Sequence, residues 1–244
     1  MLSVEVQNLT KTFGYFKAVD DISFSVEKGE IFGFIGPNGA GKSTTIRMLC
    51  GILEQTSGEG TVEGFNIKTQ SDKIKDVIGY MSQRFSLYND LTVNENINFY
   101  AGIHNLKKEE KKERKEWIIK MSGLAGKERM LAGSLSGGWR QRLSLGCAII
   151  HSPKVVFLDE PTAGVDPISR KEFWELIRNL ARAGSTVFVT THYMDEVEFC
   201  DRIAMIYRGK IIALGTPAGL KLSNKAPSLE RLFVDLIRGS DDLI

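Results

Sequence analysis

The feature that most constrains the fold is a glycine-rich segment of nine residues, Gly36-Pro37-Asn38-Gly39-Ala40-Gly41-Lys42-Ser43-Thr44. It lies between an apolar run, Ile31–Ile35, and an expected helix, Lys42–Leu49, which Gly51 would end. The spacing fits G-x-x-x-x-G-K-[ST], in which glycines let backbone N–H groups turn inward around phosphate oxygens and the helix N-terminus adds the positive end of its dipole. This strand–loop–helix unit predicts an α/β fold that binds a nucleoside triphosphate.

A second apolar run, Val155–Asp159, is followed directly by Glu160. Open α/β sheets bind ligands beyond the carboxyl ends of their strands, so we expect both carboxylates to lie near the glycine-rich loop. Asp159 and the Ser43 hydroxyl are then candidate ligands of Mg²⁺, and Lys42 would reach the β- and γ-phosphates. Glu160 would accept a proton from an attacking water, a role that typically contributes ~10²–10⁴ in rate.

The rest of the pattern is an α/β core interrupted by helices. The other predicted elements are strands within 4–35, strands at 62–67, 77–82 and Thr186–Thr191, a helix at 169–183, a hairpin of 203–207 and 210–213, and a terminal amphipathic helix. Residues 86–151 are expected to be helical, with the charged run 107–116 as a solvated helix face. The predicted domains are a core of 1–88 and 152–218, a helical subdomain of 89–151, and an extension of 219–244 packed on the core.

Composition excludes several classes of protein. The 244 residues carry 32 basic and 30 acidic side chains, a net charge of +2, which gives no footprint for a nucleic-acid binder, so no nucleic-acid partner is expected. Apolar runs are too short to cross a bilayer and the N-terminus lacks a signal core, which predicts a cytoplasmic chain. The three cysteines, Cys50, Cys147 and Cys200, are far apart and are expected to pack as small apolar residues.

Between the glycine-rich loop and the carboxylates stands the string Leu135-Ser136-Gly137-Gly138-Trp139-Arg140-Gln141. With it the chain resembles the ATP-binding-cassette (ABC) ATPases, whose signature LSGGQ precedes a helix. The resemblance covers nearly the whole chain and implies a P-loop NTPase fold: a RecA-like core with an antiparallel β subdomain and an inserted helical subdomain. It also implies that the bound nucleotide is ATP with Mg²⁺.

The resemblance implies roles for residues around the nucleotide. Phe13, just before Gly14, would stack on adenine, although Tyr15 and Phe16 are close enough to do so instead. Gln83, after the strand at 77–82, would be the Q-loop residue that touches Mg²⁺ and water. The segment after it, 84–91, would sense a membrane partner.

Two further matches follow the second carboxylate motif. Residues 163–166, Ala-Gly-Val-Asp, resemble the D-loop, which assigns Asp166 to the nucleotide interface. His192, after Thr186–Thr191, resembles the switch histidine that links the γ-phosphate to water and to Glu160. Each has a plainer alternative, since His192 could be an ordinary strand-end histidine, Gln83 a surface amide and Phe13 a core residue.

Ser136, Gly137 and Gly138 are expected to begin a helix, so their N–H groups and the Ser136 hydroxyl would form a second anion site. The resemblance implies that this site serves the γ-phosphate of ATP held by a second cassette, either a copy of this chain or a homologue. Two cassettes would then enclose two nucleotides head to tail. Hydrolysis would remove the γ-phosphate contact and weaken the pair.

The signature departs from the family at Trp139, where Gln is common, and the indole is expected to alter packing at the dimer interface or against the helical subdomain. The strings LSGGWRQR, THYMDEVEFCDRI and YRGKIIALGTP look most like the drug-exporter ATPases of ABC-2 type systems. That resemblance implies separate integral-membrane permease subunits, export of a drug or another hydrophobic compound, and a peripheral position on the cytoplasmic face of the inner or plasma membrane.

Other functions would require different sequence features. A GTPase would need an NKxD element, and the nearest string, Asn224-Lys225-Ala226-Pro227, lacks the aspartate. Non-transport ABC ATPases commonly carry two cassettes, a long coiled coil or zinc modules, which this sequence does not show. A regulatory cassette with weak turnover stays open as an alternative, and it predicts ATP-dependent association without phosphate release.

Overall fold

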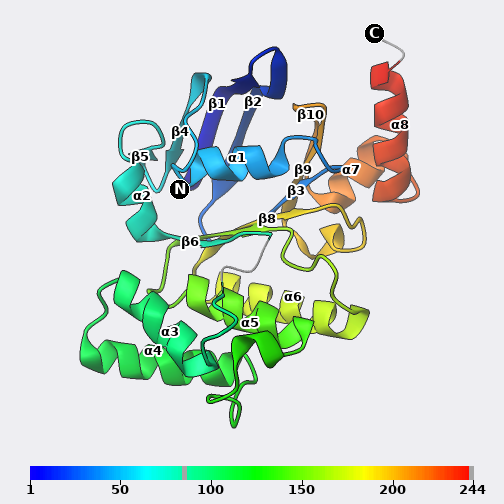
Figure 1. The fold of residues 1–244 in the computed structure, drawn as a ribbon. Helices are drawn as coiled ribbons and strands as arrows, with labels where there is room; N and C mark the ends of the chain where they lie inside the picture. The colour runs from blue at the N-terminus through cyan, green and yellow to red at the C-terminus, as the bar shows by residue number, and fades with distance from the viewer. Residues whose placement is uncertain (84–86, 242–244) are drawn as a thin grey trace.

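The computed structural model describes residues 1–83 and 87–241, which form two sheets surrounded by helices (Figure 1). The first sheet is antiparallel, with the strand order β2-β1-β4-β5. Its strands are β1 (Leu2–Phe13), β2 (Phe16–Glu27), β4 (Ser57–Val62) and β5 (Phe65–Asn66). This sheet corresponds to the antiparallel β subdomain expected from the sequence.

The second sheet has six strands in the order β10-β9-β3-β8-β7-β6. These strands are β3 (Ile31–Ile35), β6 (Ile78–Met81), β7 (Val155–Asp159), β8 (Thr186–Thr191), β9 (Arg202–Tyr207) and β10 (Lys210–Gly215). All neighbours pair in parallel except β9 and β10. The carboxyl ends of β3, β8, β7 and β6 therefore meet at one edge, which places the residues that follow these four strands side by side.

The central strands are buried along their whole length because both faces of the sheet are covered. On one face, α1 (Lys42–Leu49) lies between the two sheets (Figure 1). The core there is aromatic, and neighbouring ring centroids are 5.5 to 6.0 Å apart in a cluster of Phe24, Phe32, Phe34, Phe157 and Phe188. Such pairs add about 0.5–1.5 kcal/mol each beyond simple burial.

The opposite face of the six-stranded sheet is covered by α6 (Pro167–Arg182), with α7 (Pro217–Ser223) and α8 (Leu229–Asp241) beside it. The apolar stripe of α6 that the sequence predicts is buried there, including Phe173, Ile177 and Leu180. Leu229 and Leu232 of α8 join the same core, so the C-terminal helix packs on its own chain as expected.

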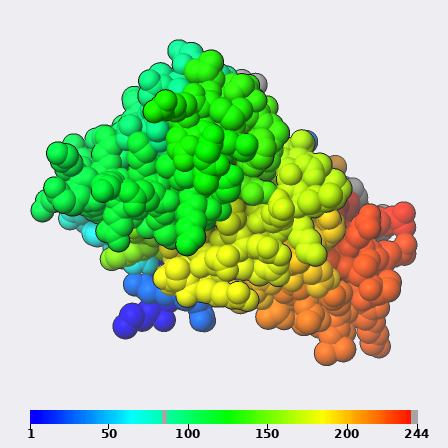
Figure 2. Space-filling view, turned by 90° about the horizontal axis from the view of Figure 1, so that it is seen from below, coloured from blue at the N-terminus to red at the C-terminus, as the bar shows by residue number. Residues whose placement is uncertain are grey.

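The helical region forms a separate apolar cluster below β6 (Figure 1). It consists of α3 (Val93–Ile103), α4 (Lys108–Met121) and α5 (Gly137–Ala148). Seen from below, it is a green lobe, and the orange and red C-terminal helices lie apart from it on the other side of the yellow segments (Figure 2). Helix α5 packs against α3 and α4 and also against β6 and α6, so it connects this lobe to the core. No helix in residues 1–83 and 87–241 is both long and apolar enough to cross a membrane.

Some sequence predictions need correction. The strand expected at 62–67 is two strands, β4 and β5, joined by a turn at Glu63 and Gly64, which have φ values of +49° and +79°. The short helices α2 (Ser71–Val77) and α7 were not expected. The helix expected at 169–183 begins at Pro167 because Asp166 caps it. The three cysteines are buried and unpaired, as expected.

Candidate functional site

The glycine-rich loop closes tightly between β3 and α1. Gly41 has a φ of +110°, and a Cβ there would lie 2.4 Å from the Ala18 carbonyl oxygen. A Cβ on Gly36 would lie 2.2 Å from the carbonyl oxygen of Ile206. No side chain described in the structure caps α1, so its first-turn N–H groups face the loop. Glycine at these positions therefore leaves a cradle of backbone donors suited to an anion.

Lys42 is the cation of this cradle, and its side chain is only 4% exposed. Its Nζ donates to the carbonyl oxygens of Gly36 at 2.7 Å and Pro37 at 3.0 Å. It also lies 3.0 Å from Oε1 of Glu160. The loop residue and the carboxylate, which are far apart in the sequence, are thus joined in a buried ion pair.

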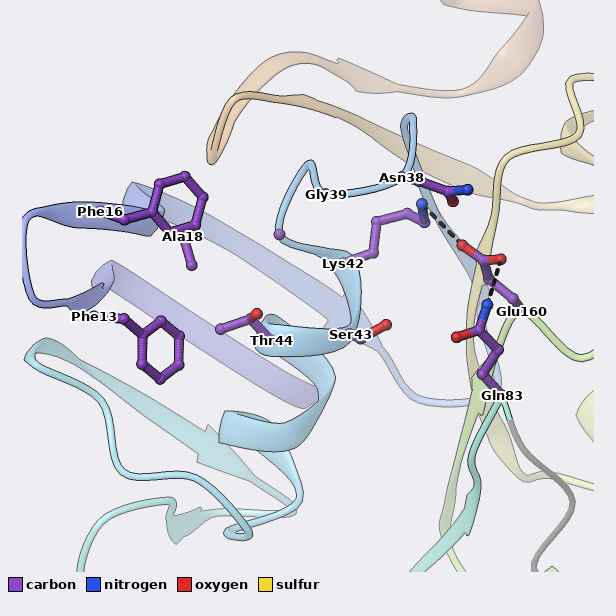
Figure 3. A pocket seen from close by; sticks show the side chains of 11 residues that line it. Phe13, Phe16, Ala18, Asn38, Gly39, Lys42, Ser43, Thr44, Gln83 and Glu160 are labelled. Atoms are coloured by element: carbon purple, nitrogen blue, oxygen red, sulfur yellow. Dashed lines mark hydrogen bonds and ion pairs between the residues drawn. The ribbon is translucent and has the colours of Figure 1, made fainter.

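Glu160 is the residue on which the site converges. Besides Lys42, its carboxylate accepts from the Gln83 amide at 3.2 Å (Figure 3). Its Oε2 also lies 3.0 Å from Nδ1 of His192. These partners follow β3, β6 and β8, which is why the parallel sheet brings them together. Glu160 has a φ of +48°, an unusual conformation for this residue type, and its N–H donates to the Thr190 hydroxyl at 2.9 Å.

Ser43 and Asp159 form an oxygen-rich pair next to this group. The Ser43 hydroxyl donates to Oδ1 of Asp159 at 3.0 Å, and the Thr190 hydroxyl donates to the same oxygen at 2.8 Å. Carboxylate and hydroxyl oxygens are the ligands that Mg²⁺ prefers, and Mg²⁺ usually completes its shell with water and substrate phosphates. The donor set at the end of β7 therefore suits this ion.

A cavity of about 480 Å³ extends from Glu160 and the glycine-rich loop to the first sheet. Its lining includes the predicted residues Asn38, Gly39, Gly41, Lys42, Ser43, Thr44, Gln83 and Glu160. Phe13 and Phe16 line the far end, beyond the start of α1 (Figure 3). Tyr15 is fully exposed and is not among the lining residues. The pocket thus has an aromatic end and a charged end, and its size is that of a site for a small molecule such as a nucleotide.

The structure does not bring the signature segment into this cavity. Ser136 is the exposed N-cap of α5, and Gly137 and Gly138 are its first residues, as predicted. Gly138 lies against the start of α6, since a Cβ there would be 2.8 Å from the Ser169 hydroxyl. Trp139 packs on the helical cluster, and Lys127 Nζ lies 4.1 Å from its ring centroid. Trp139 therefore contacts the helical subdomain, which is one of the two positions considered for the indole from the sequence.

Asp166 is likewise outside the cavity. Its carboxylate accepts from the N–H groups of Ile168 at 3.1 Å and Ser169 at 3.0 Å, so it caps α6. These hydrogen bonds lower the pKa of Asp166, and the bond from the Ser169 N–H has the largest effect. Within one chain this side chain has a helix-capping position.

Two residues near Glu160 were not singled out from the sequence. Thr190 forms hydrogen bonds with both Asp159 and Glu160. The sequence feature that could have identified it is its polar side chain near the end of an otherwise apolar strand. Glu196 is a buried carboxylate behind His192. Part of the predicted partner-sensing segment, residues 84–86, lies outside the described residues.

Comparison with known proteins agrees with this geometry. The family model described as ABC transporter matches residues 19–163. A second model, described as AAA domain, putative AbiEii toxin, Type IV TA system, matches residues 140–196. Among solved structures, an ATP-binding subunit of an ABC transporter aligns with a TM-score of 0.86 at 26% identity, covering 96% of this chain and 99% of that one. The ADP conformation of MJ1267, an ATP-binding cassette of an ABC transporter, aligns with a TM-score of 0.84 at 28% identity, covering 98% and 99%.

Curated relatives agree as well. The probable multidrug ABC transporter ATP-binding protein YbhF of Escherichia coli is 46% identical over 98% of this chain, which spans 42% of that relative's length. The linearmycin resistance ATP-binding protein LnrL of Bacillus subtilis is 42% identical over 89% of this chain and 70% of its own. The daunorubicin/doxorubicin resistance ATP-binding protein DrrA of Streptomyces peucetius is 38% identical over 91% and 67%. This chain therefore belongs to the ABC transporter family, as one of its ATP-binding ATPase cassettes with a P-loop NTPase fold.

Proposed function

We propose that this cassette hydrolyses Mg·ATP to drive an ABC-2 type exporter of drugs or other hydrophobic compounds. The observation that carries the proposal is the convergence of Lys42, Gln83 and His192 on the Glu160 carboxylate, directly beside the phosphate loop. A site that only binds nucleotide needs the loop but does not need a carboxylate surrounded by these three side chains.

The shape of the cavity suggests how ATP would lie in it. The triphosphate would occupy the loop from Gly36 to Thr44, where backbone N–H groups and the α1 N-terminus favour an anion. The adenine would reach the aromatic end, where Phe13, the candidate from the sequence, and Phe16 both line the pocket. Both rings are about half exposed, at 49% and 63%, so each has surface available to contact a base.

Ser43, Asp159 and Gln83 are the proposed holders of Mg²⁺. Ser43 and Asp159 already lie together, and the Gln83 amide donates to Glu160 through Nε2, which leaves its oxygen as a possible ligand. When bound, the ion would neutralise charge on the β- and γ-phosphates.

Hydrolysis would use Glu160 as the general base. A water oxygen would bond to the γ-phosphorus as the bond to the β–γ bridging oxygen breaks, and Glu160 would accept the water proton. Lys42 would first leave Glu160 for the γ-phosphate, because both compete for its Nζ. His192, 3.0 Å from Glu160, would hold the carboxylate and the attacking water in line.

The Ser136–Gly138 segment is proposed to complete a second nucleotide site in trans. It lies at an exposed helix N-terminus and outside the chain's own pocket. We propose that it contacts the γ-phosphate of ATP bound by a second cassette, with Asp166 at the same interface. Association would then depend on ATP, and hydrolysis would loosen it.

The exporter assignment rests on the names of the relatives. Since drug-resistance and multidrug ATP-binding proteins match most of this chain, we propose that it pairs with integral-membrane permease subunits on the cytoplasmic face of the membrane. The core of 1–88 and 152–218, the helical subdomain of 89–151 and the extension from 219 are the proposed functional divisions.

The proposal is tested by tagging the chain, solubilising membranes of the host in mild detergent, and identifying what co-purifies. The expected result is a polytopic membrane protein and Mg·ATP-dependent phosphate release from the complex. ATP-dependent association without phosphate release would favour a regulatory cassette. Turnover by a chain that never co-purifies with a membrane protein would favour a non-transport ATPase.

A further inference from the structure

Glu196 is a buried carboxylate that the proposed hydrolysis does not use. Its side chain is 1% exposed, and it lies between the loop that carries His192 and a short 3₁₀ helix, Val197–Phe199. A carboxylate removed from water is costly unless hydrogen bonds and a cation compensate it. The hydrogen-bond and ion-pair partners of Glu196 therefore indicate its role.

Both oxygens of Glu196 accept from threonine hydroxyls that belong to different segments. Oε2 accepts from Thr191 at 2.6 Å, and Oε1 accepts from Thr162 in a short hydrogen bond. The Thr191 hydroxyl accepts in turn from the N–H of Tyr193 at 3.0 Å. The Glu196 side chain thus binds directly to Thr191, just before His192, and to Thr162, two positions after Glu160, and it reaches Tyr193 through Thr191.

Arg170 of α6 supplies the compensating charge. Its Nε lies 3.5 Å from Oε1 of Glu196, within ion-pair range but without hydrogen-bond geometry. Its guanidinium also lies 4.0 Å from the Tyr193 ring centroid and pairs with Asp195 at 3.3 Å. The first turns of α6, which follow Asp166, are therefore attached to the same loop.

These contacts close a ring. Glu160 contacts His192, which directly follows Thr191 in the chain. Thr191 donates to Glu196, and Glu196 also accepts from Thr162, which is two residues after Glu160. Glu196 lies on the side of the ring away from the nucleotide pocket, whose lining does not include it. If Glu196 were absent, the loop and the turn could move separately, and the contact between Glu160 and His192 would no longer be fixed from behind.

We infer that Glu196 is a positioning residue for ATP hydrolysis: it sets the geometry between the base Glu160 and His192 and ties both to the segment leading to Asp166. The inference rests on the proposed function. It predicts a loss in kcat with ATP affinity retained, since the phosphate loop and the aromatic end of the pocket do not depend on Glu196.

The test compares Glu196→Ala and Glu196→Gln with Glu198→Gln in the full chain with its membrane partner. Glu198 is the matched control, because it lies two residues away, is exposed, and pairs with Lys221. We expect Glu196→Ala to lower kcat about 10- to 100-fold, the range usual for residues that orient a site from behind. The dissociation constant of a fluorescent ATP analogue should stay within about twofold.

Glu196→Gln should recover part of the lost rate, because an amide of the same shape keeps one acceptor oxygen for one threonine. Thr162→Val and Thr191→Val remove one hydroxyl each without changing side-chain size much, and they decide the question if Glu196→Ala fails to fold. Their effects on kcat should not add to that of Glu196→Ala, because all three changes remove the same connection.

A merely structural role would lower the thermal midpoint and the fraction of protein that binds ATP, but kcat per ATP-binding chain would be unchanged. That result would overturn the inference. An unmodified chain with no phosphate release would instead overturn the proposed function, so the two failures are distinguishable.

Discussion

The phosphate loop and the Ser136–Gly138 segment are both glycine-rich starts of helices, but the surroundings of the two differ sharply. Lys42 is almost fully buried and is tied to Gly36, Pro37 and Glu160. Ser136 is exposed, and its side chain caps nothing among the described residues, whereas Asp166 caps the neighbouring helix α6. The first site has its charged partners within the chain. The second site, Ser136–Gly138, begins a helix at the surface, so its N–H and hydroxyl donors agree with the proposal that another cassette supplies the anion.

The sharpest test of this contrast is Glu160→Gln, for which we expect the largest effect. Removing the proposed base should lower turnover by about 10²–10⁴ or more. ATP binding should remain, and the chain should accumulate as an ATP-bound dimer. Phosphate release and size-exclusion chromatography with ATP measure both effects, with Glu198→Gln as the control for a lost surface carboxylate. Turnover at the normal rate would remove Glu160 from the role of base.

Lys42→Ala should come next and should act at an earlier step. It removes the buried cation of the phosphate loop, and hydrogen bonds to charged groups contribute about 1.5–3 kcal/mol each, so ATP affinity should fall at least about tenfold. Equilibrium titration with ATP measures the loss. The control is Lys17→Ala, because Lys17 is exposed, pairs with Asp20 and is not among the residues that line the pocket, so affinity should be unchanged. Equal affinities in the two variants would contradict the phosphate-loop assignment.

Ser136→Ala tests the second site and should separate affinity from association. ATP binding by a single chain should stay the same, because Ser136 lies outside its pocket. The ATP-dependent dimer should weaken by about 10- to 100-fold, the effect of one hydrogen bond to a charged phosphate. Analytical ultracentrifugation of the variant in the Glu160→Gln background measures this effect. Ser134→Ala, whose hydroxyl donates to its own segment at Leu131, is the control. Weaker binding by the monomer would place Ser136 in the chain's own site.

Trp139→Gln should have the smallest effect. It restores the residue common in the family signature and removes the contact with Lys127, a partly exposed cation–π pair of about 0.5–1 kcal/mol. We expect a slightly lower thermal midpoint and turnover within about twofold of the unmodified chain. Calorimetry and a steady-state assay check both. A large change in turnover would show that the indole takes part in the interface between cassettes.

The sequence predicted best those parts of the molecule that are buried on both faces. The continuous apolar runs of β3, β7 and β8 are central strands, and the motif residues that follow them meet because the sheet is parallel. The turn at Glu63 and Gly64 was missed because valine and isoleucine on either side predict one strand. Short helices such as α2 have little periodicity to detect.

Within the site, motif spacing identified the residues that face the nucleotide but not those behind them. Lys42, Glu160 and His192 stand at motif positions, so the sequence pointed to them. Glu196 and Thr162 do not face the pocket, and only the fold brings the two within hydrogen-bond distance across 34 positions of sequence. The order of strands in the sheet, which local pattern does not encode, decides such contacts.

In the proposed function, the ion pair between Lys42 and Glu160 links the state of the base to the nucleotide that is bound. Before ATP arrives, the lysine ammonium lies 3.0 Å from the carboxylate of the proposed base and is its counter-ion. A diphosphate lacks the γ-phosphate and would compete for the lysine with its β-phosphate alone. The salt bridge would then respond to the third phosphate. The carboxylate would be released to accept a proton when the γ-phosphate of ATP binds the lysine, and it would stay paired with the lysine after hydrolysis.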